Sequence, residues 1–455
     1  MTTSHHPFIS TMKSRGLLHQ VTDETALGAH LASAPADAPR LAYVGFDPTA
    51  DSLTIGNLVP IMMLVHWQRA GHKPVVLSGG GTGLIGDPSG KSAERDLLSE
   101  DKVRANVDGQ LRIFGKLLDC APGRCGAHIV NNVDWLAKLG YIQVLRDVGK
   151  HFSINQMIQR DSVKSRLDNR EQGMSYTEFS YMILQAYDYL YLRTQWQSLG
   201  LPGPVTMQMG GSDQWGNIVS GIDLIRRHLA ATGDHAAGTE AAAPAAFGLT
   251  APLVTKADGG KFGKSEAGAV WLTADRTSPF AYYQFWLNAA DADVGRFLRT
   301  FTLLDIDTIA NLEAAIITDP GARAAQRALA RGATELLHGK AEMDKAESAA
   351  AALFSGDIAG LSLATLLEVL AGAPTVNLAR AAIEAGDGLG VADLLVAAAV
   401  CKSKGEARTA LEQNSITING VKATLADKLT PSSLLHNQLI AIRRGKKNWT
   451  VVKVA

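Results

Sequence analysis

The chain is organised around the stretch Tyr43-Val-Gly-Phe-Asp-Pro-Thr-Ala-Asp-Ser-Leu-Thr-Ile-Gly-Asn57. Residues 41–46 form an apolar run that predicts a short buried strand, and residues 56–70 predict a helix rich in apolar side chains. The turn between them consists of turn-forming and helix-capping residues. A strand that leads into a helix in this way points free backbone N–H groups, and the positive end of the helix dipole, into one crevice. The stretch therefore predicts a site for a nucleoside triphosphate.

The residues at the start of this helix suit such a ligand. Gly56 has no side chain, so a flat adenine or ribose can approach the backbone closely there. Thr54 and Asn57 lie three residues apart, and both can send hydrogen-bond donors to phosphate oxygens. Any α/β protein contains strands, turns and helices of this kind, so other segments have to decide the function.

Composition limits the class of protein. At 455 residues, of which 46% are apolar, the chain is too long for one core and predicts about two to four domains. Its formal net charge is zero, so contacts with nucleic acid have to come from local basic patches. We find no secretory signal and no apolar run of membrane-spanning length. Cys120, Cys125 and Cys401 lack the spacing of a zinc site, so we expect free thiols, no tightly bound metal and a cytoplasmic protein without a membrane partner.

Residues 74–77 predict a second strand, and the glycine-rich loop after it imitates two nucleotide-binding motifs. Residues 81–86 match the dinucleotide fingerprint as a string, but the acidic residues about 20 positions later lie in a polar, helix-like segment instead of ending a strand. Residues 86–92 imitate a P-loop, but the spacing is one residue short and Pro88 removes a backbone donor. We set both motifs aside, and an NAD oxidoreductase stays as an alternative that a cofactor-binding assay would decide.

The same loop carries one carboxylate, Asp87, and two cations, Lys91 and Arg95. The two cations are four residues apart, so they share one face if this segment is helical. Such a pair suits a polyphosphate, but a solvated run of charges has the same spacing.

Residues 127–131 predict a third strand, and residues 175–188 predict a helix with an apolar stripe. In this helix Tyr181, Gln185 and Asp188 recur at i, i+4 and i+7, so they line one face. A phenol, a carboxamide and a carboxylate on one face can line a pocket. A solvated polar face is the alternative, but few of the lysines and glutamates typical of such a face are present.

Residues 205–209 predict another buried strand, which ends in the run Gly210-Gly-Ser-Asp-Gln-Trp-Gly-Asn217. Ligands of parallel sheets bind outside the carboxyl ends of the strands. Asp213 is therefore placed to accept hydrogen bonds from ribose hydroxyls, and Gln214 to orient a substrate carboxylate. The alternative role of Asp213 is to cap the following helix.

Residues 230–246 are rich in alanine and glycine and predict a surface insertion, and residues 247–254 return to a strand. The chain then continues as Thr255-Lys-Ala-Asp-Gly-Gly-Lys261-Phe-Gly-Lys264-Ser265. Two lysines separated by a glycine-containing turn predict a flexible cationic loop. Lysine- and glycine-rich turns are common, so this loop alone identifies nothing.

The rest of the chain predicts two further regions. Residues 276–372 are almost entirely helical in period, and residues 373–390 contain Pro374 and several glycines and predict a linker. Residues 391–455 predict two helices, a strand ending in an Asn-Gly hairpin turn, and a strand pair. Basic residues collect in this last region, as a solubilising tail or as an RNA-binding face. They are Lys402, Lys404, Arg408, Arg443, Arg444, Lys446 and Lys447.

Taken in order, these segments resemble the class I aminoacyl-tRNA synthetases, and specifically the tyrosyl enzymes of bacteria. Residues 54–57 resemble the family's His-Ile-Gly-His signature, although Thr54 and Asn57 replace its histidines, and residues 261–265 resemble its Lys-Met-Ser-Lys-Ser signature. Residues 391–455 resemble the S4 RNA-binding module. The resemblance implies an α/β fold: a Rossmann-like parallel-sheet catalytic domain over residues 1–275, an α-helical domain over 276–372, and a small α+β S4-like domain over 391–455.

The resemblance implies ATP as a substrate, accompanied by Mg²⁺, together with L-tyrosine and tRNA(Tyr) as partners and a homodimer. It also implies roles for individual residues. The residues implied in catalysis are Thr49, Thr54, Asn57, Lys91, Arg95, Lys261 and Lys264. Those implied in tyrosine binding are Tyr43, Asp47, Asp87, Tyr181, Gln185, Asp188, Gln208 and Gln214. Those implied in ATP binding are Gly45, Pro48, Gly56, Gly211, Asp213, Lys264 and Ser265, and the seven basic residues named above are implied in tRNA binding.

Two alternatives within this class stay open. A ligase for tryptophan or another amino acid would share the same signatures, and a panel of amino acids in ATP–pyrophosphate exchange would separate it. A non-catalytic RNA-binding paralogue is the second alternative, since Thr54 departs from the family pattern. It would bind tRNA without any exchange activity.

Overall fold

The computed structural model describes residues 6–89, 97–160, 163–164, 167, 174–232, 246–260, 262–265, 268–445 and 448–455. The chain forms two compact units. The first comprises residues 1–278 and 285–338, and the second comprises residues 279–284 and 339–455. None of the helices in the described part is both long and apolar enough to cross a membrane.

The first unit is built on a six-stranded sheet with the strand order β1-β6-β5-β2-β3-β4. Neighbours from β6 to β4 are parallel, and β1 is antiparallel to β6. The five parallel strands confirm the predicted ones, whereas the two-residue strand β1 is too short to show a pattern in the sequence. The strands are β1 (Gln20–Val21), β2 (Leu41–Phe46), β3 (Lys73–Ser78), β4 (His128–Asn131), β5 (Val205–Gly211) and β6 (Phe247–Ala251).

The order in which strands are added to the sheet changes side at β2. Strands β3 and β4 lie on one side of β2, and strands β5 and β6 lie on the other. In a parallel sheet such a reversal opens a crevice at the carboxyl ends of the strands, here between β2 and β5. The turn that follows β2, which the sequence predicts as a ligand site, lies at this crevice.

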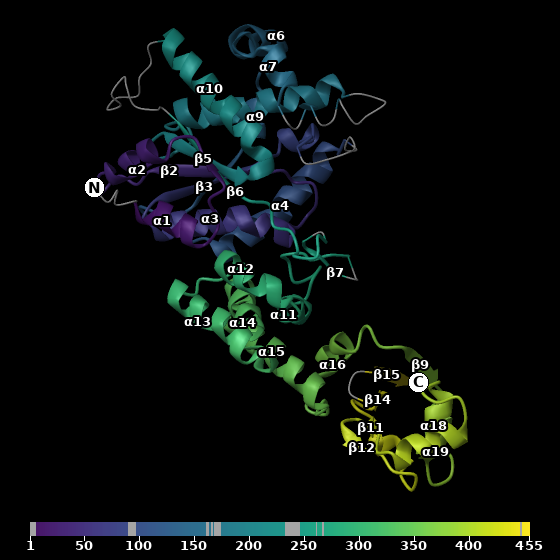
Figure 1. The fold of residues 1–455 in the computed structure, drawn as a ribbon. Helices are drawn as coiled ribbons and strands as arrows, with labels where there is room; N and C mark the ends of the chain where they lie inside the picture. The colour runs from purple at the N-terminus through teal and green to yellow at the C-terminus, as the bar shows by residue number, and fades with distance from the viewer. Residues whose placement is uncertain are drawn as a thin grey trace. The chain divides into compact units, whose positions relative to one another are not determined.

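Helices cover both faces of the sheet (Figure 1). On one face α9 (Tyr176–Thr194) and α10 (Trp215–Thr232) pack against each other and against Leu41 and Tyr43 of β2. On the other face α3 (Leu58–Arg69) is buried along nine of its 12 residues, as expected of a helix without a polar face. Among the described residues, this part also contains α1 (Pro7–Ser14), α2 (Glu24–Ala32), α4 (Glu100–Leu117), α5 (Val133–Leu136), α6 (Tyr141–Gln143) and α7 (Ile154–Ile158).

Among the described residues, the first unit also contains the helices that follow the sheet, up to α14. In α12 the buried residues Val294, Phe297, Leu298 and Phe301 recur every three or four positions, so one face packs inward. The predicted helical region 276–372 is indeed mostly helical, but the two compact units divide it after His338. Its helices are α11 (Pro279–Leu287), α12 (Asp291–Phe301), α13 (Ile306–Thr318), α14 (Ala324–His338), α15 (Lys340–Ser355) and α16 (Leu363–Val369).

The second unit contains a five-stranded sheet with the order β12-β11-β14-β15-β9. Asn419 and Gly420 have φ values of 51° and 90°, which confirms the predicted Asn-Gly turn between β11 and β12. Residues 373–390, for which we predicted a linker, contribute β9, which pairs with β15, together with α17 and β10. The elements are β9 (Thr375–Leu378), α17 (Ala381–Glu384), β10 (Leu389–Gly390), α18 (Val391–Ala397), α19 (Lys404–Glu412), β11 (Ile416–Ile418), β12 (Val421–Lys422), β13 (Lys428–Leu429), β14 (Leu439–Arg444) and β15 (Asn448–Val454).

Candidate active site

A cavity of about 640 Å³ opens at the carboxyl ends of β2, β3 and β5. It is the crevice that the strand order predicts, and most of the candidate residues found in the sequence line it. Those residues are Tyr43, Gly45, Asp47, Thr49, Thr54, Gly56, Asn57, Asp87, Tyr181, Gln185, Asp188, Gln208, Gly211, Asp213 and Gln214.

Asp188 and Tyr43 are the two least exposed of these residues, and we call the part of the cavity that they line its closed end. Asp188 is 1% exposed and accepts hydrogen bonds from Asn132 Nδ2 at 2.9 Å and from Trp135 Nε1 at 2.7 Å. Burial raises the pKa of its carboxyl to about 7, against the effect of these two donors. The hydroxyl of Tyr43 is buried without a hydrogen-bond partner, and burial together with the Asp188 charge raises the pKa of Tyr43, so this hydroxyl keeps its proton.

This closed end has the chemistry to recognise a phenol. A ligand hydroxyl can donate to the Asp188 carboxylate and can accept from the unpaired Tyr43 hydroxyl. A buried polar atom without a partner is costly, so a ligand that pairs with it gains affinity over one that does not.

A second network connects the closed end to the turn after β2. Tyr181 Oη donates to Asp47 Oδ2 at 2.8 Å, and Thr82 Oγ1 donates to Asp47 Oδ1 at 2.7 Å. Asn132 Nδ2 also donates to Thr82 Oγ1 at 3.0 Å, so the same amide serves both Thr82 and Asp188. Gly79 is required beside Asp47, because a Cβ there would lie 2.2 Å from Asp47 Oδ1.

A third network lies along the wall of the cavity. Gln214 Nε2 donates to Asp87 Oδ2 at 2.7 Å, and Gln185 Nε2 donates to Gln214 Oε1 at 3.1 Å. Asn217 Nδ2 continues the network by donating to Gln185 Oε1 at 2.8 Å. Gln208 Oε1 is buried and has no hydrogen-bond partner. The wall therefore presents the Asp87 carboxylate and an unpaired carbonyl oxygen, which suit a ligand ammonium group.

Thr54 and Asn57 contact each other at the mouth of the cavity. Both the backbone N–H and the hydroxyl of Thr54 donate to Asn57 Oδ1, at 3.0 and 2.9 Å. We expected both side chains to point donors at phosphates, whereas here the Thr54 hydroxyl is used to hold Asn57. Since the amide oxygen is fixed by two donors, the Asn57 amide nitrogen is the end that faces away from Thr54.

The cationic loop packs on the same stretch. The Ile55 N–H donates to the Val270 carbonyl at 3.0 Å, and Gly263 lies so close that a Cβ there would be 2.8 Å from Ile55 Cγ2. Gly263 has a φ of 83°, which favours glycine. The two signatures are thus neighbours, although Lys91, Arg95 and Lys261 lie outside the described residues, and only the backbone of Lys264 and Ser265 is described, as strand β7 (Lys264–Ser265).

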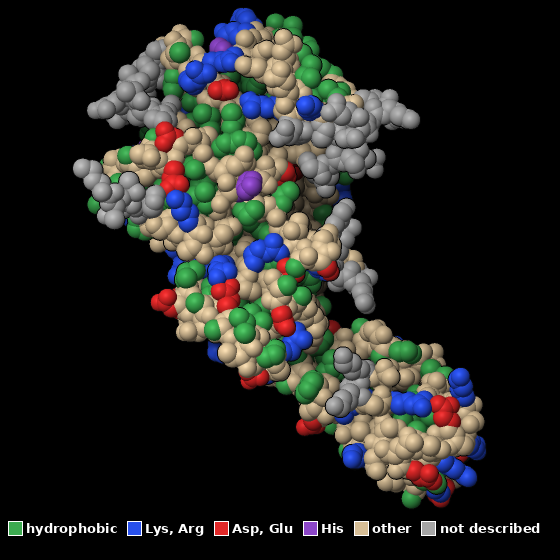
Figure 2. Space-filling view, viewed as in Figure 1, with side chains coloured by type: hydrophobic (Ala, Val, Ile, Leu, Met, Phe, Trp, Pro, Cys, Tyr) green, Lys and Arg blue, Asp and Glu red, His purple; other side chains and the backbone are tan. Residues whose placement is uncertain are grey.

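The basic residues of the second unit are mostly engaged with acidic groups or carbonyls. Arg444 donates to Glu406 Oε1 at 2.9 Å, Lys404 pairs with Asp393 at 2.5 Å, and Arg443 donates to the Phe354 carbonyl at 3.3 Å. On the face shown in Figure 2, acidic side chains stand between the basic ones of this unit. Lys402 and Arg408 are exposed, and Lys446 and Lys447 lie outside the described residues.

Sequence reasoning missed the groups that hold the ligand-facing residues in place. Asn132 and Trp135 directly follow β4, so their position at the carboxyl end of a strand was an available signal. Thr82 and Asn217 follow the ends of β3 and β5 in the same way, so the same signal was available for them. Within the described part of the chain, no group of three or more His, Cys, Asp or Glu side chains is arranged to hold a metal ion.

The chain is similar to proteins of one family over nearly its whole length. Residues 36–355 match the class I tRNA synthetases (W and Y), and residues 368–452 match the tyrosine–tRNA ligase SYY-like C-terminal domain. The tyrosine–tRNA ligase of Roseiflexus castenholzii is 46% identical over 413 residues, which cover 90% of this chain and 92% of that protein. Tyrosine–tRNA ligase 2 of Enterococcus faecalis is 46% identical over 450 residues, which cover 98% and 99% of the two chains.

Solved structures show the same relationship. A C-terminally truncated mitochondrial tyrosyl-tRNA synthetase of Aspergillus nidulans has a TM-score of 0.66 at 31% identity, covering 76% of this chain and 94% of that one. A tryptophanyl-tRNA synthetase of Encephalitozoon cuniculi, with a TM-score of 0.51 at 13% identity over 74% of this chain and 87% of that one, shares the fold alone. The sequence identity to these tyrosine enzymes, at 31% to 46%, is thus well above the 13% of the tryptophan enzyme that shares the fold.

Proposed function

The chain belongs to the family of class I tRNA synthetases for tryptophan and tyrosine, and we infer that it is a tyrosine–tRNA ligase. It activates L-tyrosine with ATP to give tyrosyl adenylate and pyrophosphate, and then transfers tyrosine to the 3′-terminal adenosine of tRNA(Tyr). The observation that carries this proposal is the closed end of the cavity, where the unpaired hydroxyl of Tyr43 stands beside the buried carboxylate of Asp188.

Tyrosine binds with its phenol at the closed end and its backbone groups toward the mouth. Asp188 accepts the phenol hydrogen and Tyr43 donates to the phenol oxygen. Asp87, Tyr181 and Gln185 hold the ammonium group, Asp47 and Gln208 add acceptors beside it, and Gln214 orients the carboxylate. Phenylalanine leaves the Tyr43 hydroxyl unpaired and gives Asp188 no further donor, which is why a site of this kind rejects it. Tyrosyl enzymes are themselves the standard example of that rule.

The first chemical step needs no nucleophilic side chain, because the tyrosine carboxylate attacks the α-phosphorus of ATP. The protein contributes position and charge stabilisation. ATP lies along the turn after β2 and the end of β5, on Gly45, Pro48, Gly56, Gly211 and Asp213. Thr49, Asn57 (held by Thr54), Lys91, Arg95, Lys261, Lys264 and Ser265 act on the phosphates, and Mg²⁺ enters as part of the Mg–ATP substrate.

We place tRNA binding in the helical region and in the C-terminal part, residues 276–372 and 391–455. Lys402 and Arg408 are exposed, so they are ready to contact the RNA backbone together with Lys446 and Lys447. Lys404, Arg443 and Arg444 have to exchange their present partners to join them. Residues 1–275 carry the chemistry.

The protein acts as a homodimer in the cytoplasm in this proposal. Tyr141, Ile142, Ile154 and Tyr176 are 62%, 73%, 57% and 61% exposed, which is unusual for large hydrophobic side chains. Tyr141 and Tyr176 are hydrogen-bonded to each other, so these two exposed rings adjoin. A second copy of the chain would cover them. All three cysteines are free, as in a reducing compartment.

Tyrosine-dependent ATP–pyrophosphate exchange tests the function. The protein should exchange with tyrosine but not with tryptophan or phenylalanine, and Asp188→Ala should remove exchange while the far-UV circular dichroism stays that of the folded chain. Exchange with tryptophan would point to the sister enzyme. Binding of tRNA without any exchange would point to a non-catalytic paralogue, and wild-type exchange by Asp188→Ala would refute the phenol site.

A further inference from the structure

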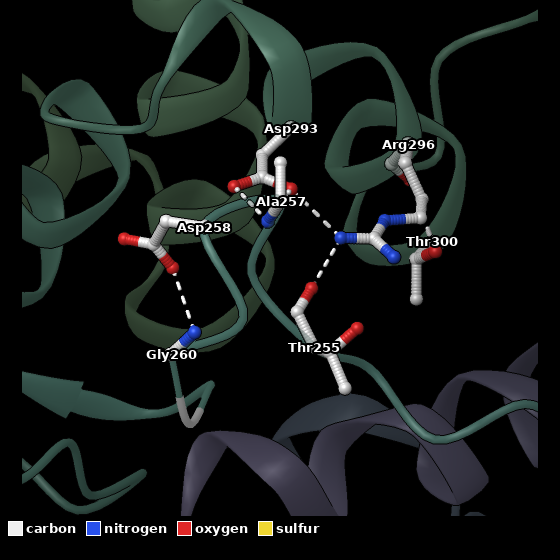
Figure 3. Close-up of polar contacts among 7 residues, drawn as sticks. All are labelled: Thr255, Ala257, Asp258, Gly260, Asp293, Arg296 and Thr300. Carbon is white, nitrogen blue, oxygen red and sulfur yellow. Dashed lines mark hydrogen bonds and ion pairs between the residues drawn. The ribbon is translucent and has the colours of Figure 1, made fainter.

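Helix α12 holds the segment that leads into the cationic loop (Figure 3). The backbone N–H of Ala257 donates to both carboxylate oxygens of Asp293, at 3.0 and 3.1 Å. Arg296, one turn further along the helix, donates from Nη2 to Asp293 Oδ1 at 2.7 Å and also to the backbone carbonyl of Thr255. A single ion pair on α12 therefore binds the backbone of two loop residues.

The loop segment itself is a closed turn. The Lys256 N–H donates to the Gly260 carbonyl at 3.2 Å, and the Gly259 N–H donates back to the Lys256 carbonyl at 3.0 Å. The Gly260 N–H also donates to the Asp258 carboxylate at 2.8 Å. Because the turn is linked internally, an anchor on its first residues fixes the whole turn.

A second anchor lies on the far side of the turn. The Phe262 ring stacks on Phe301 of α12, with centroids 5.3 Å apart and planes within 12° of each other. It also contacts Phe297 of the same helix at 5.1 Å and Trp286 at 6.1 Å. The loop is thus attached to α12 by a polar contact before the signature and by an aromatic contact within it.

Helix α12 is in turn fixed to the start of the chain. Arg15 is only 7% exposed and donates to the backbone carbonyls of Arg299, Thr302 and Leu304, at 3.0, 2.8 and 2.6 Å. One guanidinium thus binds three carbonyls in and just after the last turn of α12, and it also complements the negative end of the helix dipole. Helix α12 is therefore fixed in place and can hold the cationic loop in one position.

The supported turn forms part of the cavity wall, since Thr255, Gly259, Gly260 and Phe262 line the cavity. We propose that Asp293 and Arg296 are positioning residues, which hold the cationic loop against the triphosphate site and so control the use of ATP without contacting it. The inference rests on the proposed function, because it takes the loop as a partner of the ATP phosphates. The buried, charge-assisted bonds of Asp293 should matter more than the exposed side of the ion pair.

Steady-state kinetics of exchange test the proposal with Asp293→Asn, Arg296→Gln and a matched control. The control is Arg299→Gln, which removes the 2.5 Å ion pair with Glu313 from the same helix without touching the loop. We call Asp293→Asn and Arg296→Gln the clamp variants. Each should lower kcat/KM for ATP by about fivefold to tenfold, through a higher KM or a lower kcat, because a small misplacement of phosphate-binding groups slows the reaction. Their KM for tyrosine should stay unchanged, and Arg299→Gln should change neither.

Two further measurements separate positioning from folding. Cleavage of the loop by trypsin after Lys256 should be faster in the clamp variants at an unchanged melting temperature, and Arg296→Lys should restore part of the ATP effect. The double variant Asp293→Asn/Arg296→Gln should lose little more than the worse single variant, because the two residues act as one unit.

The outcomes that overturn the inference differ from those that overturn the function. If the clamp variants match Arg299→Gln in ATP kinetics while the wild type exchanges normally, Asp293 and Arg296 do not position the loop. Equal losses for tyrosine and ATP with a lower melting temperature mean a purely structural role, which also overturns the inference. If the wild type shows no tyrosine-dependent exchange, the proposed function itself is wrong.

Discussion

The two ends of the cavity are built from different kinds of structure. At the closed end, Asp188 and Tyr43 come from a long helix and a central strand, are at most 1% exposed, and Asp188 is fixed by two hydrogen bonds. At the mouth, Thr54 and Asn57 belong to a short turn, and the described part of the cationic loop is held by contacts with α12 and with Ile55. Recognition of the amino acid therefore depends on side chains that need not move. Binding of the ATP phosphates depends on turns that can move. Changes at one end should affect mainly one substrate.

Among the variants that keep every side chain of the tyrosine site, the largest effect should come from Gly79→Ala beside Asp47. The new Cβ would lie 2.2 Å from Asp47 Oδ1 and 3.1 Å from the Asp47 Cα, so a side-chain rotation alone does not relieve the clash. We expect kcat/KM for tyrosine in the exchange assay to fall by about 100-fold, since a shift of about 1 Å in a substrate-positioning group has that effect.

The matched control for this variant is Gly115→Ala in helix α4. A Cβ at Gly115 meets nothing within 4 Å, so activity should be unchanged and the unfolding free energy should rise by about 0.5–1 kcal/mol. A Gly79→Ala protein with normal tyrosine kinetics would show that the Asp47 network is not part of the tyrosine site.

Tyr43→Phe should have the next largest effect, and on tyrosine alone. The substitution removes the hydroxyl that is buried without a partner, so one hydrogen bond to the phenol is lost at a cost of about 1–1.5 kcal/mol, or about tenfold in kcat/KM for tyrosine. The KM for ATP should stay the same, and the preference for tyrosine over phenylalanine should fall by the same factor. The melting temperature should not fall, because an unpaired buried hydroxyl does not stabilise the fold. A matching change in the KM for ATP would contradict the separation of the two ends.

The pH dependence of tyrosine binding should report on Asp188. Burial raises the pKa of this carboxyl to about 7, and only the ionised form can accept the phenol hydrogen while Asn132 and Trp135 keep donating to it. The affinity for tyrosine, measured by calorimetry without ATP, should therefore fall below pH 7 and be about tenfold weaker at pH 6 than at pH 8. In Asp188→Asn the remaining weak affinity should not depend on pH in this range.

The carboxyl of Asp188 should also make the unfolding free energy depend on pH. Its pKa is about 7 in the folded chain against the ordinary value of 3.8, so the folded state holds a proton that the unfolded state has lost between these values. The contribution of Asp188 to the unfolding free energy is therefore largest below pH 4 and decreases as the pH rises to about 7. Denaturant titrations of wild type and Asp188→Asn should differ in slope over this window, and parallel pH profiles would contradict the raised pKa.

Much of this arrangement could be predicted from the sequence because it is local. The apolar run and turn around Asp47 fix β2 and the crevice, and the helical spacing of Tyr181, Gln185 and Asp188 places three side chains on one face. The Asn-Gly turn of the second unit was predicted in the same way, since it requires only two adjacent residues with positive φ.

The remainder depends on contacts between segments far apart in the chain. Asn132 meets Asp188 only because β4 and α9 are brought together, across 56 positions of sequence. The charge of Arg443 predicts an RNA contact, but it gives no sign that this side chain donates to the carbonyls that end α15. Charge and periodicity do not show which group a long side chain contacts in the fold. Strand β1 has two residues, which is too few to show any periodicity.

The smallest effect should come from Thr54→Ala at the mouth. Thr54 fixes the Asn57 amide through two hydrogen bonds, and the substitution removes only the one made by its hydroxyl. We expect kcat for exchange to fall by about threefold with an unchanged KM for tyrosine, since one partly exposed hydrogen bond is worth about 0.5–1 kcal/mol, and Thr54→Ser should restore it. In an Asn57→Ala background the same substitution should have no further effect, because Thr54 then has nothing to orient. A full additional loss in that background would mean that the Thr54 hydroxyl reaches the phosphates directly, and that the threonine replaces a family histidine in function as well as in position.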